Sequence, residues 1–111
     1  MTQLQMPQPD ASIKQAADNA NDMWYRLALS LVKTVAHHHS SPEITADDIW
    51  DALAIWPDIN THEPRALGPV LLDAQRRGWI VPTDRVRASR RRQINHGRRI
   101  TIWRSLIWQG Q

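Results

Sequence analysis

The spacing of apolar residues changes at Gly78 from a period near 3.6 to a period of two. Before Gly78, four apolar residues share one side of a helix, namely Leu67, Val70, Leu71 and Ala74. After it, residues 79–82 and 100–108 alternate and are rich in β-branched and aromatic side chains, which is typical of strands. The connecting residues 83–99 contain a suitable reversal next to Gly97. The sequence therefore predicts a helical part followed by a two-stranded hairpin with a long tip.

The same hairpin concentrates positive charge. Residues 85–108 hold eight arginines and no acidic residue in 24 positions. Residues 1–64 have three basic and nine acidic side chains, whereas residues 65–111 have eleven arginines and two aspartates. No carboxylate follows Asp84, so gathering these arginines on one hairpin costs repulsion unless a polyanion is near. The pattern favours binding to nucleic acid phosphates; an acidic protein surface and a solvated loop are the alternatives.

The N-terminal part predicts one long helix with an optional interruption. Residues 1–9 show no periodicity and are expected to be a flexible leader. From Asp10 an apolar stripe runs along one helical side through Ile13, Ala17, Ala20, Trp24, Leu27 and Leu31. The segment DNAND at 18–22 is poor helix material and allows a break, which would separate an N-terminal helical extension, 10–22, from a helix over 23–38.

Two further helices are predicted before the hairpin. The second starts after Thr45, because Asp48 three residues later forms a variant capping box, and it ends at Pro57. Its apolar stripe comprises Ile49, Trp50, Leu53 and Trp56. The third is expected over about 62–77, with a kink or widening at Pro69, because a proline inside a helix removes a hydrogen bond.

This order of elements predicts an α+β fold, mainly α, of the winged helix-turn-helix type. It has three helices, a C-terminal β-hairpin wing and an extended N-terminal helix, with residues 23–109 as the winged helix domain. A chain of 111 residues has room for one such core. Ile44 can supply the short third strand of the sheet. Trp24, Trp50, Trp79 and Trp103 are expected inside, and Trp108 is expected to be an exposed contact surface.

Three segments resemble small winged-helix-type proteins encoded by bacteriophages of actinobacteria. They are ITADDIWDAL, HEPRALGPVL and SRRRQINHGRRITIWRSLI, and the resemblance covers about residues 23–107. It implies the winged helix fold and DNA binding, with phage gene control or replication as the setting.

The candidate DNA contacts follow from this architecture. The third helix would enter the major groove, and the wing, 85–99, would lie on the backbone or minor groove. The candidate residues are Thr61, His62, Arg65, Pro69, Arg76, Arg77, Arg85, Arg87, Arg90, Arg91, Arg92, Arg98 and Arg99. Gly68 would allow close backbone approach. Arg104 lies inside a predicted strand and is expected to pair with a helix carboxylate.

The remaining polar clusters favour no catalytic or metal site. Neighbouring histidines at 37–39 point in different directions on a helix and suit its C-terminal end. Asp47 and Asp48, with Asp51, show the ordinary preference of carboxylates for a helix start. The chain has no cysteine, phosphate loop or serine elbow, so we expect no enzyme and no cofactor.

The predicted function is therefore double-stranded DNA binding in a cytoplasmic setting, with no membrane contact. The alternative is a phage protein-interaction module that binds and modulates a host protein through the basic wing. Either would be compatible with a homodimer through the N-terminal helix, whose stripe resembles a short heptad seam.

Overall fold

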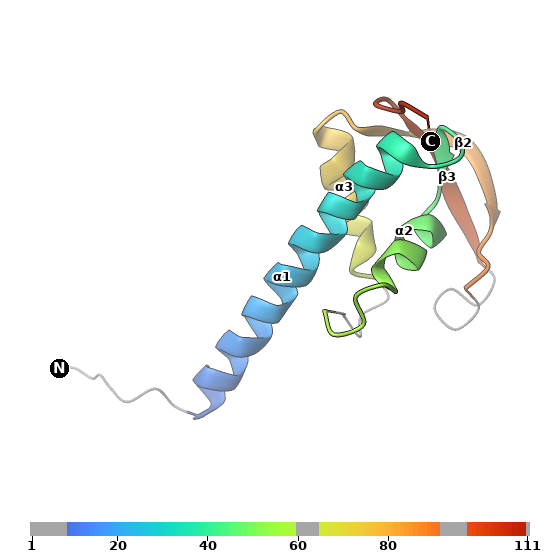
Figure 1. Cartoon of the computed structure of the whole chain (residues 1–111). Helices are drawn as coiled ribbons and strands as arrows, with labels where there is room; N and C mark the ends of the chain where they lie inside the picture. The colour runs from blue at the N-terminus through green and yellow to red at the C-terminus, as the bar shows by residue number, and fades with distance from the viewer. Residues whose placement is uncertain (1–8, 60–64, 92–97, 111) are drawn as a thin grey trace.

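The computed structural model describes residues 9–59, 65–91 and 98–110, with side chains described from Asn21 onward. Three helices and a three-stranded sheet follow one another along the chain (Figure 1). Their bounds are α1 Pro9–His38, β1 Glu43–Ile44, α2 Ala46–Leu53, α3 Leu67–Arg76, β2 Ile80–Ala88 and β3 Arg99–Ser105. No helix among these residues has a stretch long and apolar enough to cross a membrane.

Helix α1 is continuous over 30 residues, so the break allowed at 18–22 does not occur. Its buried side chains lie on one face and are Trp24, Ala28, Leu31, Val32 and Ala36. Its first half extends beyond the other elements (Figure 1). At its last turn, the backbone N–H of Gln109 donates to the carbonyl of His37, and Trp108 Nε1 donates to that of His39, each at 2.8 Å. The C-terminal segment thus caps the end of α1.

Helix α2 begins as the capping box predicts. The backbone N–H of Thr45 donates to Asp48 Oδ2 at 2.7 Å. The helix ends at Leu53, four residues before Pro57, and its last turn is followed by turns rather than by more helix. Trp56 is therefore not on the buried stripe but 39% exposed.

Helix α3 starts later than predicted. It begins at Leu67 rather than near residue 62, which makes Pro69 its third residue. An N–H at this position has no partner within the helix, so the proline costs no hydrogen bond there. The predicted kink at Pro69 is wrong for this reason. The predicted buried face is confirmed, because Leu67, Val70, Leu71 and Ala74 are all buried.

The end of α3 falls where the sequence predicts it. Gly78 has a positive φ of 80°. Its N–H donates to the carbonyl of Gln75 at 3.0 Å, and the N–H of Trp79 donates to that of Ala74 at 3.1 Å. This pair of bonds is the glycine-dependent Schellman ending, which turns the chain directly into β2.

The sheet is antiparallel with the order β1-β3-β2. Ile44 lies opposite Trp103, which confirms the predicted third strand. β2 is longer than the predicted strand 79–82, and β3 begins at Arg99, so the tip of the hairpin is 89–98 rather than 83–99. Arg85, Arg87 and Arg99 therefore belong to strands, not to a loop.

The core lies between the three helices and one face of the sheet (Figure 1). Trp24 and Trp50 pack in it with ring centroids 6.0 Å apart, and Trp103 joins them from β3. Trp79 is half-buried and Trp108 is 42% exposed. The fold is thus α+β, with the helices on one face of the sheet and no helix or strand of the described residues over the other face.

Candidate nucleic-acid interface

The outward side of α3 carries the first group of candidate contacts. Its exposed residues are Arg65, Pro69, Leu72, Gln75 and Arg76. Apart from its chain neighbours and the nearby helix backbone, no atom of the described residues lies within 4 Å of the position that a Cβ would occupy on Gly68. The beginning of α3 therefore offers an open side on which the backbone of another molecule can come close.

Arg77, at the end of α3, is held by the protein itself. Its Nε donates to Asp73 Oδ1 at 3.1 Å, and its guanidinium lies 5.4 Å from the ring centroid of Trp79. Tyr25 Oη donates to the other oxygen of Asp73 at 2.9 Å. The bond from Tyr25 and then that from Arg77 lower the pKa of Asp73, while burial and the bond to Asp73 raise the pKa of Tyr25. Asp73 thus joins α3 to α1 through Tyr25 and also holds the side chain of Arg77.

Three arginines of the hairpin form ion pairs with acidic residues from the N-terminal half. Arg85, in β2, pairs across β3 with Glu43 on the opposite edge strand β1. Arg90 Nη2 lies 3.1 Å from Asp51 Oδ2, and Arg91 Nη1 lies 3.0 Å from Asp51 Oδ1. The prediction that no carboxylate offsets these arginines is wrong, because it considered only neighbours in the sequence.

The chain that leaves β2 is also bound to the first turn of α2 through Asp47. This carboxylate is 0% exposed. It accepts hydrogen bonds from Ser89 Oγ at 2.8 Å and from the backbone N–H of Arg90 at 2.7 Å. The side chain of Arg90 lies further from it, with Nε 3.7 Å from Oδ2. The bond and charge of Asp51, with smaller contributions from Asp47 and Asp48, raise the pKa of Arg90.

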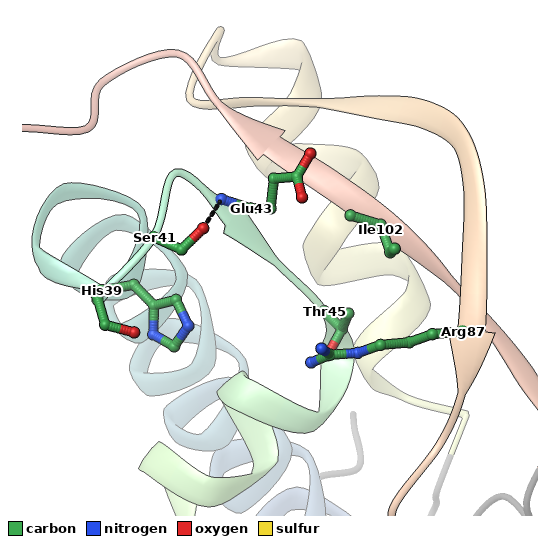
Figure 2. A pocket seen from close by; sticks show the side chains of 7 residues that line it. His39, Ser41, Glu43, Thr45, Arg87 and Ile102 are labelled. Atoms are coloured by element: carbon green, nitrogen blue, oxygen red, sulfur yellow. Dashed lines mark hydrogen bonds between the residues drawn. The ribbon is translucent and has the colours of Figure 1, made fainter.

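Arg87 lies on the uncovered side of the sheet, where it borders a pocket of about 250 Å³ (Figure 2). The pocket is lined by His39, Ser40, Ser41, Glu43, Thr45, Arg87 and Ile102. Figure 2 shows the imidazole of His39 on one side of the opening and the guanidinium of Arg87 on the other. Arg87 Nη2 donates a long bond of 3.4 Å to Thr45 Oγ1. The pocket thus combines the guanidinium of Arg87 with hydroxyl groups and the carboxylate of Glu43, so its lining contains both signs of charge.

Arg98 and Arg99, where the hairpin returns, are exposed. Among the described residues, no carboxylate lies within ion-pair distance of either side chain. The same holds for Arg104, so its predicted pairing with a helix carboxylate is not found among the described residues. Glu43 is its neighbour across the strands, but that carboxylate binds Arg85. Three other candidates lie outside the described residues: Thr61, His62 and Arg92.

Sequence analysis missed the residues that hold the hairpin. Asp47 and Asp51 were interpreted as electrostatic partners of their own helix start, and Ser89 was not singled out. The one available signal was the acidic excess of the N-terminal half, which matches the arginine excess of the C-terminal half. That match indicates ion pairing between the halves but does not say which residues pair.

The histidine run ends α1 and contacts α2. His37 and His38 occupy the last turn of α1, and their rings lie 5.6 Å apart. His39 Nε2 lies 3.9 Å from Asp48 Oδ2. Within the described part of the chain, no group of three histidine or carboxylate side chains is placed to hold a metal ion.

Comparison of the chain with known protein families, with curated proteins and with solved structures gave no match.

Proposed function

We propose that this protein binds double-stranded DNA as a winged helix domain and catalyses no reaction. The observation that carries the proposal is the arrangement of α3 and the hairpin. The elements follow the order α1, β1, α2, α3, β2, β3, and the strands are arranged β1-β3-β2. In a winged helix domain, this order places the third helix in the major groove and the hairpin on the adjacent backbone.

The proposed role of α3 rests on its two faces. One face is fully committed to the core, and the other presents a mixture of small, apolar and polar side chains, namely Gly68, Pro69, Leu72, Gln75 and Arg76. Glutamine and arginine donate to base edges in the major groove, and Leu72 suits a thymine methyl group. The two ends of the hairpin tip and the beginning of α3 lie toward the same lower side of the folded part in Figure 1.

The proposed backbone contacts are hairpin arginines that no carboxylate of the described residues approaches within ion-pair distance. Arg98 and Arg99 are the first choice, because they flank the tip and are exposed. Arg87 and Arg104 lie on the uncovered face of the sheet and are the second choice. The resemblance to phage proteins adds gene control or replication in a bacteriophage as the proposed setting.

A salt-titrated binding measurement tests this function. Fluorescence anisotropy with a labelled random duplex should give a dissociation constant that rises steeply with salt, because each phosphate contact releases counterions. Replacing both Arg98 and Arg99 by alanine should lower the slope of log K against log salt by about two, at roughly 0.9 per contact. The matched control is Arg26→Ala with Lys33→Ala, which removes the same charge from α1 and should leave the slope unchanged.

The groove contact is tested separately. Arg76→Ala and Gln75→Ala should weaken binding to a selected duplex more than binding to random duplexes, because base contacts carry sequence preference. A protein whose duplex affinity hardly changes between about 50 and 200 mM salt does not bind through phosphate contacts. That result, or equal binding by the Arg98/Arg99 variant, would reject the proposal.

A protein partner is the second candidate, favoured by the turn after α2. Ile55 is 70% exposed and Trp56 is 39% exposed in neighbouring positions. Aromatic and large aliphatic side chains are the usual anchors of protein interfaces. If duplex binding fails while Trp56→Ala and Ile55→Ser abolish the capture of one stoichiometric protein from nuclease-treated lysate, the partner is a protein.

A further inference from the structure

The first two turns of α2 hold the start of the hairpin tip with two kinds of contact. The inner contact is the buried carboxylate of Asp47, which binds Ser89 Oγ and the N–H of Arg90. The outer contact is Asp51, whose two oxygens bind one guanidinium each, those of Arg90 and Arg91. The side chain of Asp51 is 50% exposed. The inner contact fixes the backbone, and the outer contact binds the guanidinium groups of the two arginines.

The outer contact resembles the way in which a DNA phosphate binds two arginines. A phosphodiester offers two charged oxygens, and arginine binds such oxygens and carboxylates with the same donor geometry. Asp51 offers its two oxygens to the same donors. A phosphate that takes these same donors, Arg90 Nη2 and Arg91 Nη1, must therefore replace Asp51.

The charge around Arg90 and Arg91 also disfavours a phosphate while the contact is closed. Arg90 Nη2 lies 3.6 Å from Asp48 Oδ1 in addition to its bond to Asp51. With Asp47, three carboxylates surround two guanidinium groups, so the cluster has a net negative charge. Arg98 and Arg99 have no such neighbours among the described residues. The two sides of the tip thus differ in their availability to a polyanion.

The outer contact can open without loss of the inner one. Exposed ion pairs contribute only about 0–1 kcal/mol, and salt or a competing anion weakens them further. The side chain of Arg90 is 59% exposed and that of Arg91 is 31% exposed. The carboxylate of Asp47 is buried, and its hydrogen bonds hold the start of the tip in either case.

We propose that Asp51 is an intramolecular competitor of DNA phosphate for Arg90 and Arg91. This inference rests on the proposed function. With Asp51 in place, Arg90 and Arg91 stay paired within the protein, and among the described arginines at the ends of the tip Arg98 and Arg99 bind DNA. When DNA displaces Asp51, both further arginines join the interface, so Asp51 sets how many phosphates the wing neutralises.

The test compares Asp51→Asn with Asp58→Asn. Both variants remove one negative charge by the same substitution, and Asp58 is an exposed residue with no ion pair among the described residues. Duplex binding is measured by anisotropy across salt concentrations. Asp51→Asn should bind more tightly than Asp58→Asn, with a slope steeper by about 0.9 for each arginine that it releases. If two arginines are released, the ratio of the affinity of Asp51→Asn to that of Asp58→Asn falls about tenfold between about 50 and 200 mM salt.

A triple variant ties the effect to the two arginines. In the Arg90→Ala and Arg91→Ala background, Asp51→Asn should no longer change the slope relative to Asp58→Asn. Urea unfolding followed by tryptophan fluorescence verifies that each variant is folded. If Asp51→Asn is not folded, Asp51→Ser is used in its place. A slope that is unchanged or lower in a folded Asp51 variant would overturn the proposal and indicate that Asp51 presents the arginines to DNA.

A heparin column separates failure of this proposal from failure of the proposed function. The salt concentration at which each variant elutes measures the arginines available to any polyanion. If no variant binds duplex DNA but Asp51→Asn elutes later than Asp58→Asn, then Asp51 does compete for the arginines and the DNA proposal is wrong. Equal elution, with or without DNA binding, contradicts the role of Asp51.

Discussion

Asp47 and Ser89 are 42 positions apart in the sequence, yet Ser89 Oγ donates a hydrogen bond of 2.8 Å to the buried Asp47 Oδ1. The same carboxylate accepts the backbone N–H of Arg90. A residue at the start of α2 therefore determines where the hairpin tip begins. The wing is joined to the helices by this contact as well as by the sheet.

Removing the carboxylate should destabilise the fold. In Asp47→Ala, the buried Ser89 Oγ and the part-buried N–H of Arg90 lose their acceptor, and we expect a loss of about 1–3 kcal/mol in the free energy of unfolding. Ser89→Ala removes one donor and should cost about 1 kcal/mol. Urea unfolding followed by tryptophan fluorescence measures both. An Asp47→Ala variant as stable as the parent would show that the contact contributes nothing.

The acid stability of the protein should depend on Tyr25. The lowered pKa of Asp73 means that its charged form is favoured by folding. The stability that the charged carboxylate contributes is therefore fully present above pH 3.8, its ordinary pKa, and is lost as the pH falls through the lowered pKa. Tyr25→Phe removes the largest cause of the lowered pKa of Asp73. The difference in stability between parent and variant should therefore shrink as the pH falls below 3.8.

Unfolding at a series of acidic pH values measures this difference. Asp73→Asn is the control, because it has no carboxyl group to protonate and should lose this part of the acid dependence. A stability difference between parent and Tyr25→Phe that stays constant through the acid range would contradict the coupling of Tyr25 and Asp73.

A substitution at Gly68 should affect the stability of α3 and the binding of DNA in opposite directions. The space around it is open, so Gly68→Ala should fit and should stabilise the helix by up to about 1 kcal/mol. If the beginning of α3 lies against DNA, the added methyl group should nevertheless weaken duplex binding. A thermal melt and anisotropy on the same sample give both values. Tighter or unchanged binding by the stabilised variant would place DNA away from this side.

The first half of α1 leads us to expect that the protein associates with a second copy of itself. It extends beyond the other elements in Figure 1. A helical segment as short as this half is only marginally stable in water when nothing packs against it. We propose that a second copy of the chain covers it, which sedimentation equilibrium should detect as a concentration-dependent dimer. A chain that starts at Asn21 should remain folded and monomeric. A monomer at all concentrations in the full chain would refute this proposal.

Much of the fold was predictable because local patterns specify local structure. The capping box at Thr45, the glycine ending at Gly78 and the change of period after it depend on residues within a few positions of one another. The predicted third strand at Ile44 and the buried face of α3 follow from the same kind of pattern. Errors occurred at element ends, where Pro69 fits either a kinked long helix or the first turn of a short one.

The sequence by itself determined the order of the elements, their buried faces and the excess of arginine in the hairpin. Only the tertiary structure decided which arginines remain available. The pairs of Arg85, Arg90 and Arg91 with Glu43 and Asp51 join residues about 40 positions apart. Charge attraction depends on distance in space and not on distance along the chain, so these pairs exist only once β1 joins the sheet and α2 packs against the hairpin.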